Sequence, residues 1–197
     1  VGKIGEKQAI AWIVQVAEAL NYLHTQPTPI IHRDIKPANI RVTPQDKAIL
    51  VDFGLVKLYN PSVKTTIGAR AVTPGYSPPE QYGQGSTNIQ TDVYAVGATL
   101  YTMLTGQQPM ESVHRLTGGS LPTCNELNPE IAPTTSQIVE RAMHINPSSR
   151  FQTVEEFHDA LIGKTLPAAP EADAAALPAP RRLSTGALIG TLVGLAL

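Results

Sequence analysis

The residues best suited to chemistry lie in one stretch near the N-terminus. Positions 32–39 read His-Arg-Asp-Ile-Lys-Pro-Ala-Asn, and Asp-Phe-Gly follows at 52–54. Two short apolar runs between them, joined by a proline-containing turn segment, predict a β-hairpin. The residue that enters the first strand of a hairpin lies beside the residue that leaves the second, so Asn39 and Asp52 should meet at one edge. With Asp34 nearby, their oxygen atoms are suited to hold a hard cation such as Mg²⁺ against phosphate groups.

This set of residues resembles the catalytic loop and the metal-binding motif of eukaryotic-type serine/threonine protein kinases, a family with bacterial, membrane-anchored members. The resemblance implies that Asp34 is the catalytic base and that Lys36 neutralises the transferring phosphoryl group and contacts ATP. It implies that Asn39 and Asp52 bind ATP and Mg²⁺. The alternative is a polar loop with a chance Asp-Phe-Gly, and the complete set in order argues against it. The remaining motif residues would be structural or regulatory: His32, Arg33, Phe53 and Gly54.

Positions 73–80 resemble the segment that receives the peptide substrate in this family. Thr73, Gly75 and Tyr76 would form it, and Thr73 would hydrogen-bond towards the catalytic loop. Family members often end this segment with Ala-Pro-Glu, whereas this chain has Pro-Pro-Glu. The resemblance therefore implies protein substrates.

Two further acidic residues have structural roles by the same resemblance. Glu80 is expected to form a buried pair with Arg150, and such a pair fixes geometry more than it adds net stability. Asp92 is expected to bond to the backbone of the catalytic loop. It lies at the start of a predicted helix, 91–105, whose N-cap would be Thr91.

The stretch 55–72 shows no sustained helical or strand period, and loops of this length are usually functional. By its position it resembles a kinase activation loop, with Thr65 and Thr66 as candidate phosphorylation sites. Arg33 could pair with a phosphate there, helped by Lys57. In the alternative interpretation, Arg33 bonds only to backbone carbonyls and the threonines are solvated.

Helical periodicity predicts four helices, at 6–23, 91–105, 131–146 and 153–162. The second is apolar almost all round and should be central and buried. Trp12 is predicted to pack in the core. His24 is interpreted as a residue that caps the first helix, where the helix dipole favours it.

Composition limits the classes of function. The 197 residues are 42% hydrophobic with a formal charge of −1, which argues against a basic nucleic-acid-binding surface. Cys124 is the single cysteine, so no internal disulfide can form, and no His–Cys pattern accompanies it. It is predicted to be a buried, unreactive thiol in a reduced compartment.

The predicted fold class is α+β: a mostly helical, kinase-like C-terminal lobe with a small catalytic hairpin, at 1–162. An Ala/Pro-rich, disordered linker at 163–182 and the start of a transmembrane helix at 183–197 would follow. Arginines before the apolar run favour a single-pass protein of the cell membrane with a cytoplasmic kinase domain. Glycines at every fourth position of that run would allow a homodimer, and lipid-facing glycines are the alternative: Gly186, Gly190 and Gly194.

The function predicted from the resemblance is ATP-dependent phosphoryl transfer to serine or threonine hydroxyls of proteins, in signalling. The sequence contains no Gly-rich loop and no Val-Ala-x-Lys lysine, so this chain by itself should be nearly inactive. Arg41 stands where the family usually has an apolar residue beneath the adenine. A pseudokinase or scaffolding module of the same fold, and a small-molecule phosphotransferase of kinase-like fold, remain as alternatives.

Overall fold

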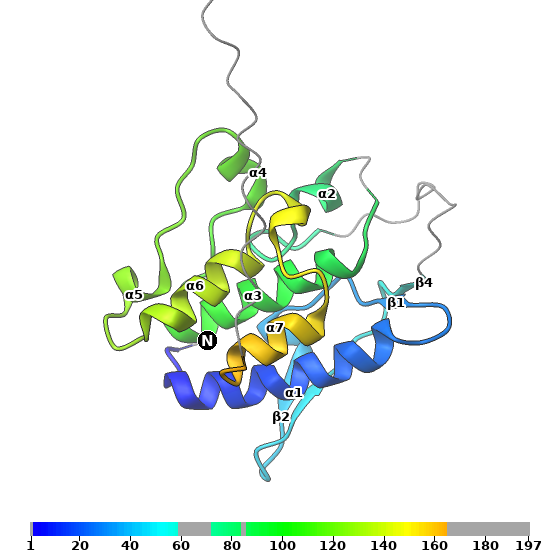
Figure 1. Cartoon of the computed structure of the whole chain (residues 1–197), viewed down its shortest axis with the longest axis horizontal. Helices are drawn as coiled ribbons and strands as arrows, with labels where there is room; N and C mark the ends of the chain where they lie inside the picture. Colours follow the sequence, from blue (N-terminus) through cyan, green and yellow to red (C-terminus); the bar gives the residue numbers. More distant parts are fainter. Residues whose placement is uncertain (1, 59–71, 84–85, 165–197) are drawn as a thin grey trace, which may run out of the picture.

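The computed structural model describes residues 2–58, 72–83 and 86–164. The fold is mostly helical with one small hairpin, as the sequence predicts (Figure 1). A second small sheet, which pairs Ile30–Ile31 with Lys57–Leu58, is not predicted by the sequence, because two residues show no period. The helices are α1 (Glu6–His24), α2 (Pro79–Tyr82), α3 (Ile89–Thr105), α4 (Ser112–Leu116), α5 (Cys124–Leu127), α6 (Pro133–Ala142) and α7 (Val154–Leu161). The strands are β1 (Ile30–Ile31), β2 (Ile40–Val42), β3 (Ala48–Leu50) and β4 (Lys57–Leu58).

Helix α3 is the centre of the core. Every residue from 91 to 105 is buried, because the helix is apolar on all sides and contacts α1, α6 and α7. Its N-cap is Asn88 and not Thr91. Thr91 is the third residue of a capping box, in which its hydroxyl accepts from the Asn88 backbone N–H at 3.1 Å. Gly106 ends the helix with a left-handed φ of 73°.

The hairpin formed by β2 and β3 pairs Ile40 with Leu50, as the sequence predicts. Its turn is held by α1, because the Trp12 indole N–H donates to Asp46 Oδ1 at 2.7 Å and the Gln8 amide donates to the same carboxylate. The prediction that Trp12 packs in the core is therefore wrong: the ring is half-buried and its N–H fixes the turn. Figure 1 shows this hairpin projecting past α1.

The later helices are shorter than their periodicity suggests. Helix α6 begins at Pro133, a residue type that suits the first helical position. It ends at Ala142, several residues before Pro147. Thr153 caps α7 by accepting from the Glu156 backbone N–H at 3.1 Å. The short helices α4 and α5 were not predicted, because four or five residues show no period.

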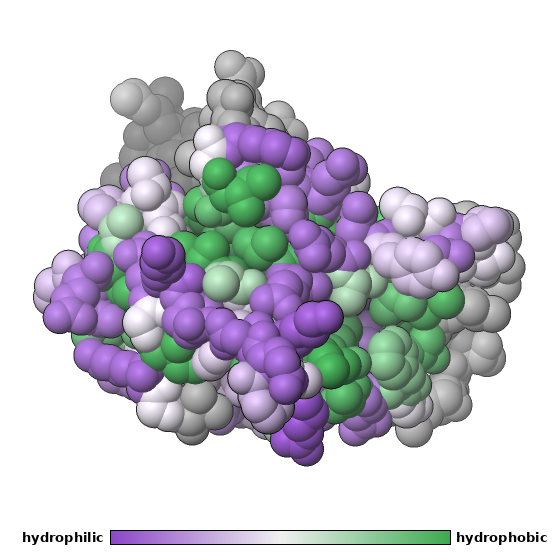
Figure 2. Space-filling view, turned by 90° about the horizontal axis from the view of Figure 1, so that it is seen from below, coloured by the Kyte–Doolittle hydropathy of each residue, from purple (hydrophilic) through white to green (hydrophobic). Residues whose placement is uncertain are grey.

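The surface view in Figure 2 shows mainly hydrophilic residues with smaller hydrophobic areas between them. Among the described residues, no helix is long and apolar enough to cross a membrane. The described ranges include only the first two residues of the predicted linker. The rest of the linker, the predicted membrane segment and its glycine pattern lie outside them.

Helix α3 packs closely against Ala142 of α6 at Gly97. A methyl group added there would lie 2.7 Å from Ala142 Cβ, so Gly97→Ala should lower the free energy of unfolding by about 1–2 kcal/mol despite better helix propensity. Urea unfolding of the full chain measures this. Gly83→Ala is the control, since its added methyl meets no atom within 4 Å. Equal midpoints for both variants would show that the α3–α6 contact can relax freely.

Candidate active site

The Asp34 carboxylate receives hydrogen bonds from three side chains of the site. Thr73 Oγ1 donates to Oδ1 at 2.8 Å and Asn39 Nδ2 donates to Oδ2 at 2.9 Å. The Lys36 ammonium lies 2.9 Å from the carboxylate and 3.2 Å from Thr73 Oγ1. The structure thus brings together four residues that the sequence separates by up to 39 positions. Asp34 remains 9% exposed, which leaves a narrow opening towards a substrate.

Two opposing effects set the charge of Asp34. Burial by itself would raise its pKa, but the hydrogen bonds from Lys36, Thr73 and Asn39 and the charge of Lys36 outweigh burial and hold the pKa below its ordinary range. Asp34 is therefore a carboxylate at neutral pH. It can accept a hydrogen bond from a hydroxyl group, as a weak base positioned by its neighbours.

Asn39 and Asp52 present oxygen atoms suited to a hard cation. The Asn39 side-chain N–H₂ donates to Asp34, and its side-chain Oδ1 has no partner among the described residues. Asp52 is exposed, with a left-handed φ of 66°, and its Oδ1 accepts from the Gly54 backbone N–H at 3.2 Å. The Val51 backbone N–H donates to the Asn39 backbone carbonyl, so Asp52 follows directly after the residue that pairs with Asn39 across the hairpin.

This pair fits Mg²⁺ bound jointly with phosphates, which needs only one or two protein ligands. The described residues contain no group of three or more His, Cys, Asp or Glu side chains that could form a closed metal cage.

Asp92 holds the backbone of the catalytic loop. Its Oδ2 accepts from the His32 N–H and its Oδ1 from the Arg33 N–H, both at 2.8 Å. These bonds keep Arg33 at a φ of 71°, a conformation that a non-glycine residue rarely adopts. Asp92 is 0% exposed and belongs to α3, so the loop is tied to the centre of the core.

His24 has a different role from the one predicted. It is buried, and its Nε2 lies 2.9 Å from Asp92 Oδ2. It therefore supports Asp92, and the residue that caps the C-terminus of α1 is Thr25. The sequence could not show this, because the two residues are 68 positions apart and a lone histidine at a helix end has a simpler local explanation.

The rings of His32 and Phe53 connect the two motifs. Their centroids are 5.0 Å apart in an edge-to-face arrangement, with His32 fully buried and Phe53 half exposed. Burial lowers the pKa of His32, so the ring is neutral at physiological pH. This matches an architectural role beneath the loop.

Arg33 faces the substrate segment through its backbone. Its carbonyl accepts from the Gln81 amide at 2.9 Å, a contact that the sequence did not suggest. The predicted phosphate partners, Thr65 and Thr66, lie outside the described residues, so their pairing with Arg33 stays a prediction.

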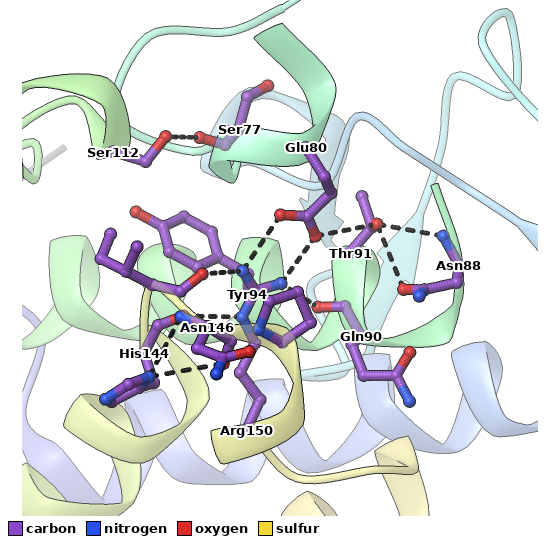
Figure 3. A network of polar contacts seen from close by, with 12 residues as sticks. Ser77, Glu80, Asn88, Gln90, Thr91, Tyr94, Ser112, His144, Asn146 and Arg150 are labelled. Atoms are coloured by element: carbon purple, nitrogen blue, oxygen red, sulfur yellow. Dashed lines mark hydrogen bonds and ion pairs between the residues drawn. The ribbon is translucent and has the colours of Figure 1, made fainter. Parts of the chain in front are cut away.

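Glu80 and Arg150 form the predicted ion pair (Figure 3). Arg150 is 0% exposed, with Nη1 2.7 Å from Glu80 Oε1 and Nη2 3.1 Å from Oε2. The other donors reach carbonyl oxygens, so all five N–H groups have partners. The acceptors are His144, Gln90 and Ile145. This pair joins the end of the substrate segment to the C-terminal helices.

The substrate segment has a fixed backbone. Gly75 has a φ of 78°, and a Cβ there would lie 2.7 Å from the Pro109 carbonyl oxygen, so glycine is required. The Tyr76 hydroxyl bonds to Thr102 Oγ1 at 3.1 Å. An open cavity of about 340 Å³ lies beside this segment and is lined by Lys36, Tyr76 and Thr102, among others.

Arg41 lies on the exposed side of β2, opposite Ile49. Ile49 is 47% exposed and Val42 is 42% exposed, which is high for residues of their type. The hairpin therefore offers a mixed surface of one arginine and aliphatic side chains beside the Asn39–Asp52 edge.

The protein kinase domain family matches residues 1–162, and the chain belongs to this family. Two similar relatives are a probable serine/threonine-protein kinase of Clostridium acetobutylicum, 34% identical over 167 residues, and PknD of Mycobacterium tuberculosis, 33% identical over 171 residues. Each alignment covers 81% of this chain but only 25% and 26% of the relatives. The chain thus spans about a quarter of the length of these kinases.

The chain is also similar to a relative named a tyrosine-protein kinase and to a kinase domain of known structure. MasK of Myxococcus xanthus, named a tyrosine-protein kinase, is 30% identical over 161 residues, covering 76% of this chain and 25% of MasK. The crystal structure of the PknI kinase domain of M. tuberculosis matches with a TM-score of 0.63 and 26% identity. That match covers 83% of this chain and 58% of the PknI chain.

Replacement of Asp92 tests its role in holding the loop. Asp92→Asn exchanges one acceptor oxygen for an N–H₂ group that must face a buried donor, so the free energy of unfolding should fall by about 3 kcal/mol. Chemical denaturation of the full chain measures the loss. Asp159→Asn, which changes a surface ion pair on α7, should barely move the unfolding midpoint. A similarly small effect of Asp92→Asn would remove Asp92 as the anchor.

The balance of effects on Asp34 can be measured directly. Lys36→Met removes a donor and a positive charge that lower the Asp34 pKa, so the pKa should rise relative to the parent. In the parent, the lowered Asp34 pKa stabilises the folded protein at pH values above the ordinary carboxyl pKa. This stabilisation is lost as the pH falls through the lowered pKa, and the variant should lack it at every pH. Carboxyl-carbon NMR titration follows the pKa. Lys47→Met, on the exposed turn, is the control, and equal shifts in both variants would contradict the assignment.

Proposed function

We propose that this chain is the catalytic part of a kinase that transfers the γ-phosphoryl group of ATP to serine or threonine hydroxyls of proteins. The observation that carries the proposal is the Asp34 carboxylate held at once by Lys36, Thr73 and Asn39. Positioning and electrostatic stabilisation supply most of the rate enhancement in this chemistry, and this arrangement offers both.

Each residue of the cluster has a distinct part in the proposed reaction. Asp34 accepts a hydrogen bond from the attacking hydroxyl and orients it towards the phosphorus. Lys36 stands beside that carboxylate and neutralises charge that develops on the transferred group. Bound Mg²⁺–ATP supplies the phosphoryl group and the metal charge, and Asn39 and Asp52 would hold it.

The proposed substrate class follows from the segment beside the cluster. Thr73 joins that segment to Asp34, while Gly75 and Tyr76 continue it over a rigid backbone. A small-molecule phosphotransferase would need no such peptide-binding segment. A pseudokinase would be expected to lack a catalytic group, whereas this chain has Asp34, Lys36, Asn39 and Asp52, and both Lys36 and Asn39 contact Asp34.

Lys36 supports the choice of serine or threonine over tyrosine, because a lysine two residues after the base is typical of that subclass. The family alone does not decide, since relatives with both names match the chain. Membrane anchoring through 183–197 and dimerisation are further proposals that rest on the sequence alone.

The assignment of Asp34 is tested in the complete kinase domain, because the chain matches 58% of the PknI kinase domain. Asp34→Asn should keep the fold and lower the rate of phosphoryl transfer by roughly 10²–10⁴-fold, the usual loss of a general base. Asp46→Asn, in the turn of the same hairpin, is the matched control. Activity of Asp34→Asn within about threefold of the control would overturn the assignment.

The acceptor residue is determined in the same assay with radiolabelled ATP and a mixed protein substrate. Acid hydrolysis followed by phosphoamino-acid separation should give phosphoserine and phosphothreonine. Phosphotyrosine as the main product would leave the Asp34 mechanism in place but contradict the proposed subclass.

A further inference from the structure

We propose that a cavity between α3, α5 and α6 binds a small molecule with one ring-sized apolar part and one anionic group. The cavity has a volume of about 360 Å³, at the lower end of the range for ligand pockets. None of the catalytic or substrate-segment residues lines it. It is therefore a second site, independent of the proposed kinase reaction.

Tyr101 supplies the first indication of a ligand. The residue is only 3% exposed and lines the cavity, yet its hydroxyl has no hydrogen-bond partner among the described residues. The hydroxyl is not one of the enclosed polar atoms that lack a partner, so it reaches the open cavity, where it can donate to water or to an acceptor on a ligand. Burial raises the pKa of Tyr101 to about 12, and the group therefore keeps its proton and donates.

Arg115 supplies a positive charge at the same wall. Its Nη1 donates to the Met143 carbonyl oxygen at 2.8 Å and lies 3.4 Å from the Tyr94 hydroxyl, which fixes the guanidinium. Nε and Nη2 have no partner among the described residues. A carboxylate is the group that best matches a guanidinium edge beside a phenol donor.

The rest of the cavity is suited to an apolar body. Leu121, Val139 and Met143 line it, together with Cys124. Burial raises the pKa of the Cys124 thiol to about 12, so this sulfur is a neutral, polarisable contact and not a nucleophile. An aromatic or short aliphatic group would displace water from these apolar side chains, which favours binding.

Several carboxylates oppose the proposed anion. The charge of Glu126 acts on Tyr101 and that of Glu6 on Cys124. Glu140 also lines the cavity, although it is exposed and its Oε1 accepts from the Ser136 hydroxyl at 3.3 Å. Its presence limits the ligand to a single negative charge placed towards Arg115 and Tyr101. Because Glu140→Gln removes this negative charge, the variant should bind an anion more tightly.

The test uses three probes with the same ring and different head groups: phenylacetate, phenylacetamide and phenethylamine. Each is titrated into the isotope-labelled full chain, and amide and side-chain NMR shifts report the site and the dissociation constant. Phenylacetate should shift signals of Tyr101, Arg115 and Cys124 and bind more tightly than the amide, and phenethylamine should bind least tightly.

Tyr101→Phe removes only the hydroxyl, which makes no bond within the described protein, so the fold should be retained. It should weaken phenylacetate binding by roughly tenfold, the effect of losing one hydrogen bond to a charged group. Tyr22→Phe changes an exposed tyrosine on α1 and is the matched control. Absence of phenylacetate shifts at these residues, equal affinity for phenethylamine, or equal binding by both tyrosine variants would each overturn the proposal.

Discussion

The buried carboxylate of Asp92 is the interaction on which the active-site geometry depends. It lies on the fully buried helix α3 and accepts from two consecutive backbone N–H groups of the catalytic loop and from His24. A carboxylate in the core is costly unless its lone pairs are used, and here three donors use them. The same bonds hold Arg33 in a left-handed conformation, which directs the following residue, Asp34, towards the substrate side.

Local strain is concentrated around this loop. The described non-glycine residues with left-handed φ are Arg33, Asp46 and Asp52, all in the catalytic loop or its hairpin. Each such residue costs on the order of 1–3 kcal/mol unless neighbouring bonds compensate it. Asp92 compensates at Arg33, and helix α1 compensates at Asp46 through the Trp12 indole. Well-packed helices thus stabilise a backbone shape that the loop by itself would not keep.

The Glu80–Arg150 pair extends the same principle to the substrate segment. Arg150 is fully buried and fully hydrogen-bonded, and it connects the residues after Thr73 to the last helices of the fold. Asp34 and Thr73 then meet because the loop is anchored by α3 and the segment by Arg150. The chemical cluster is small, but its geometry depends on contacts across the whole domain.

The sequence by itself determined the family, the hairpin and the long helices, because motif spacing and apolar periodicity are local properties. Through the resemblance it also indicated that Thr73 would bond towards Asp34. It also indicated Glu80–Arg150 and the backbone role of Asp92, through the resemblance. Only the tertiary structure showed that His24 supports Asp92, that Trp12 holds a turn, and that Gln81 bonds to Arg33. The unpaired Tyr101 hydroxyl beside Arg115 likewise became visible only in three dimensions. In each case the partners are far apart in sequence, and packing, not local preference, decides which polar groups meet.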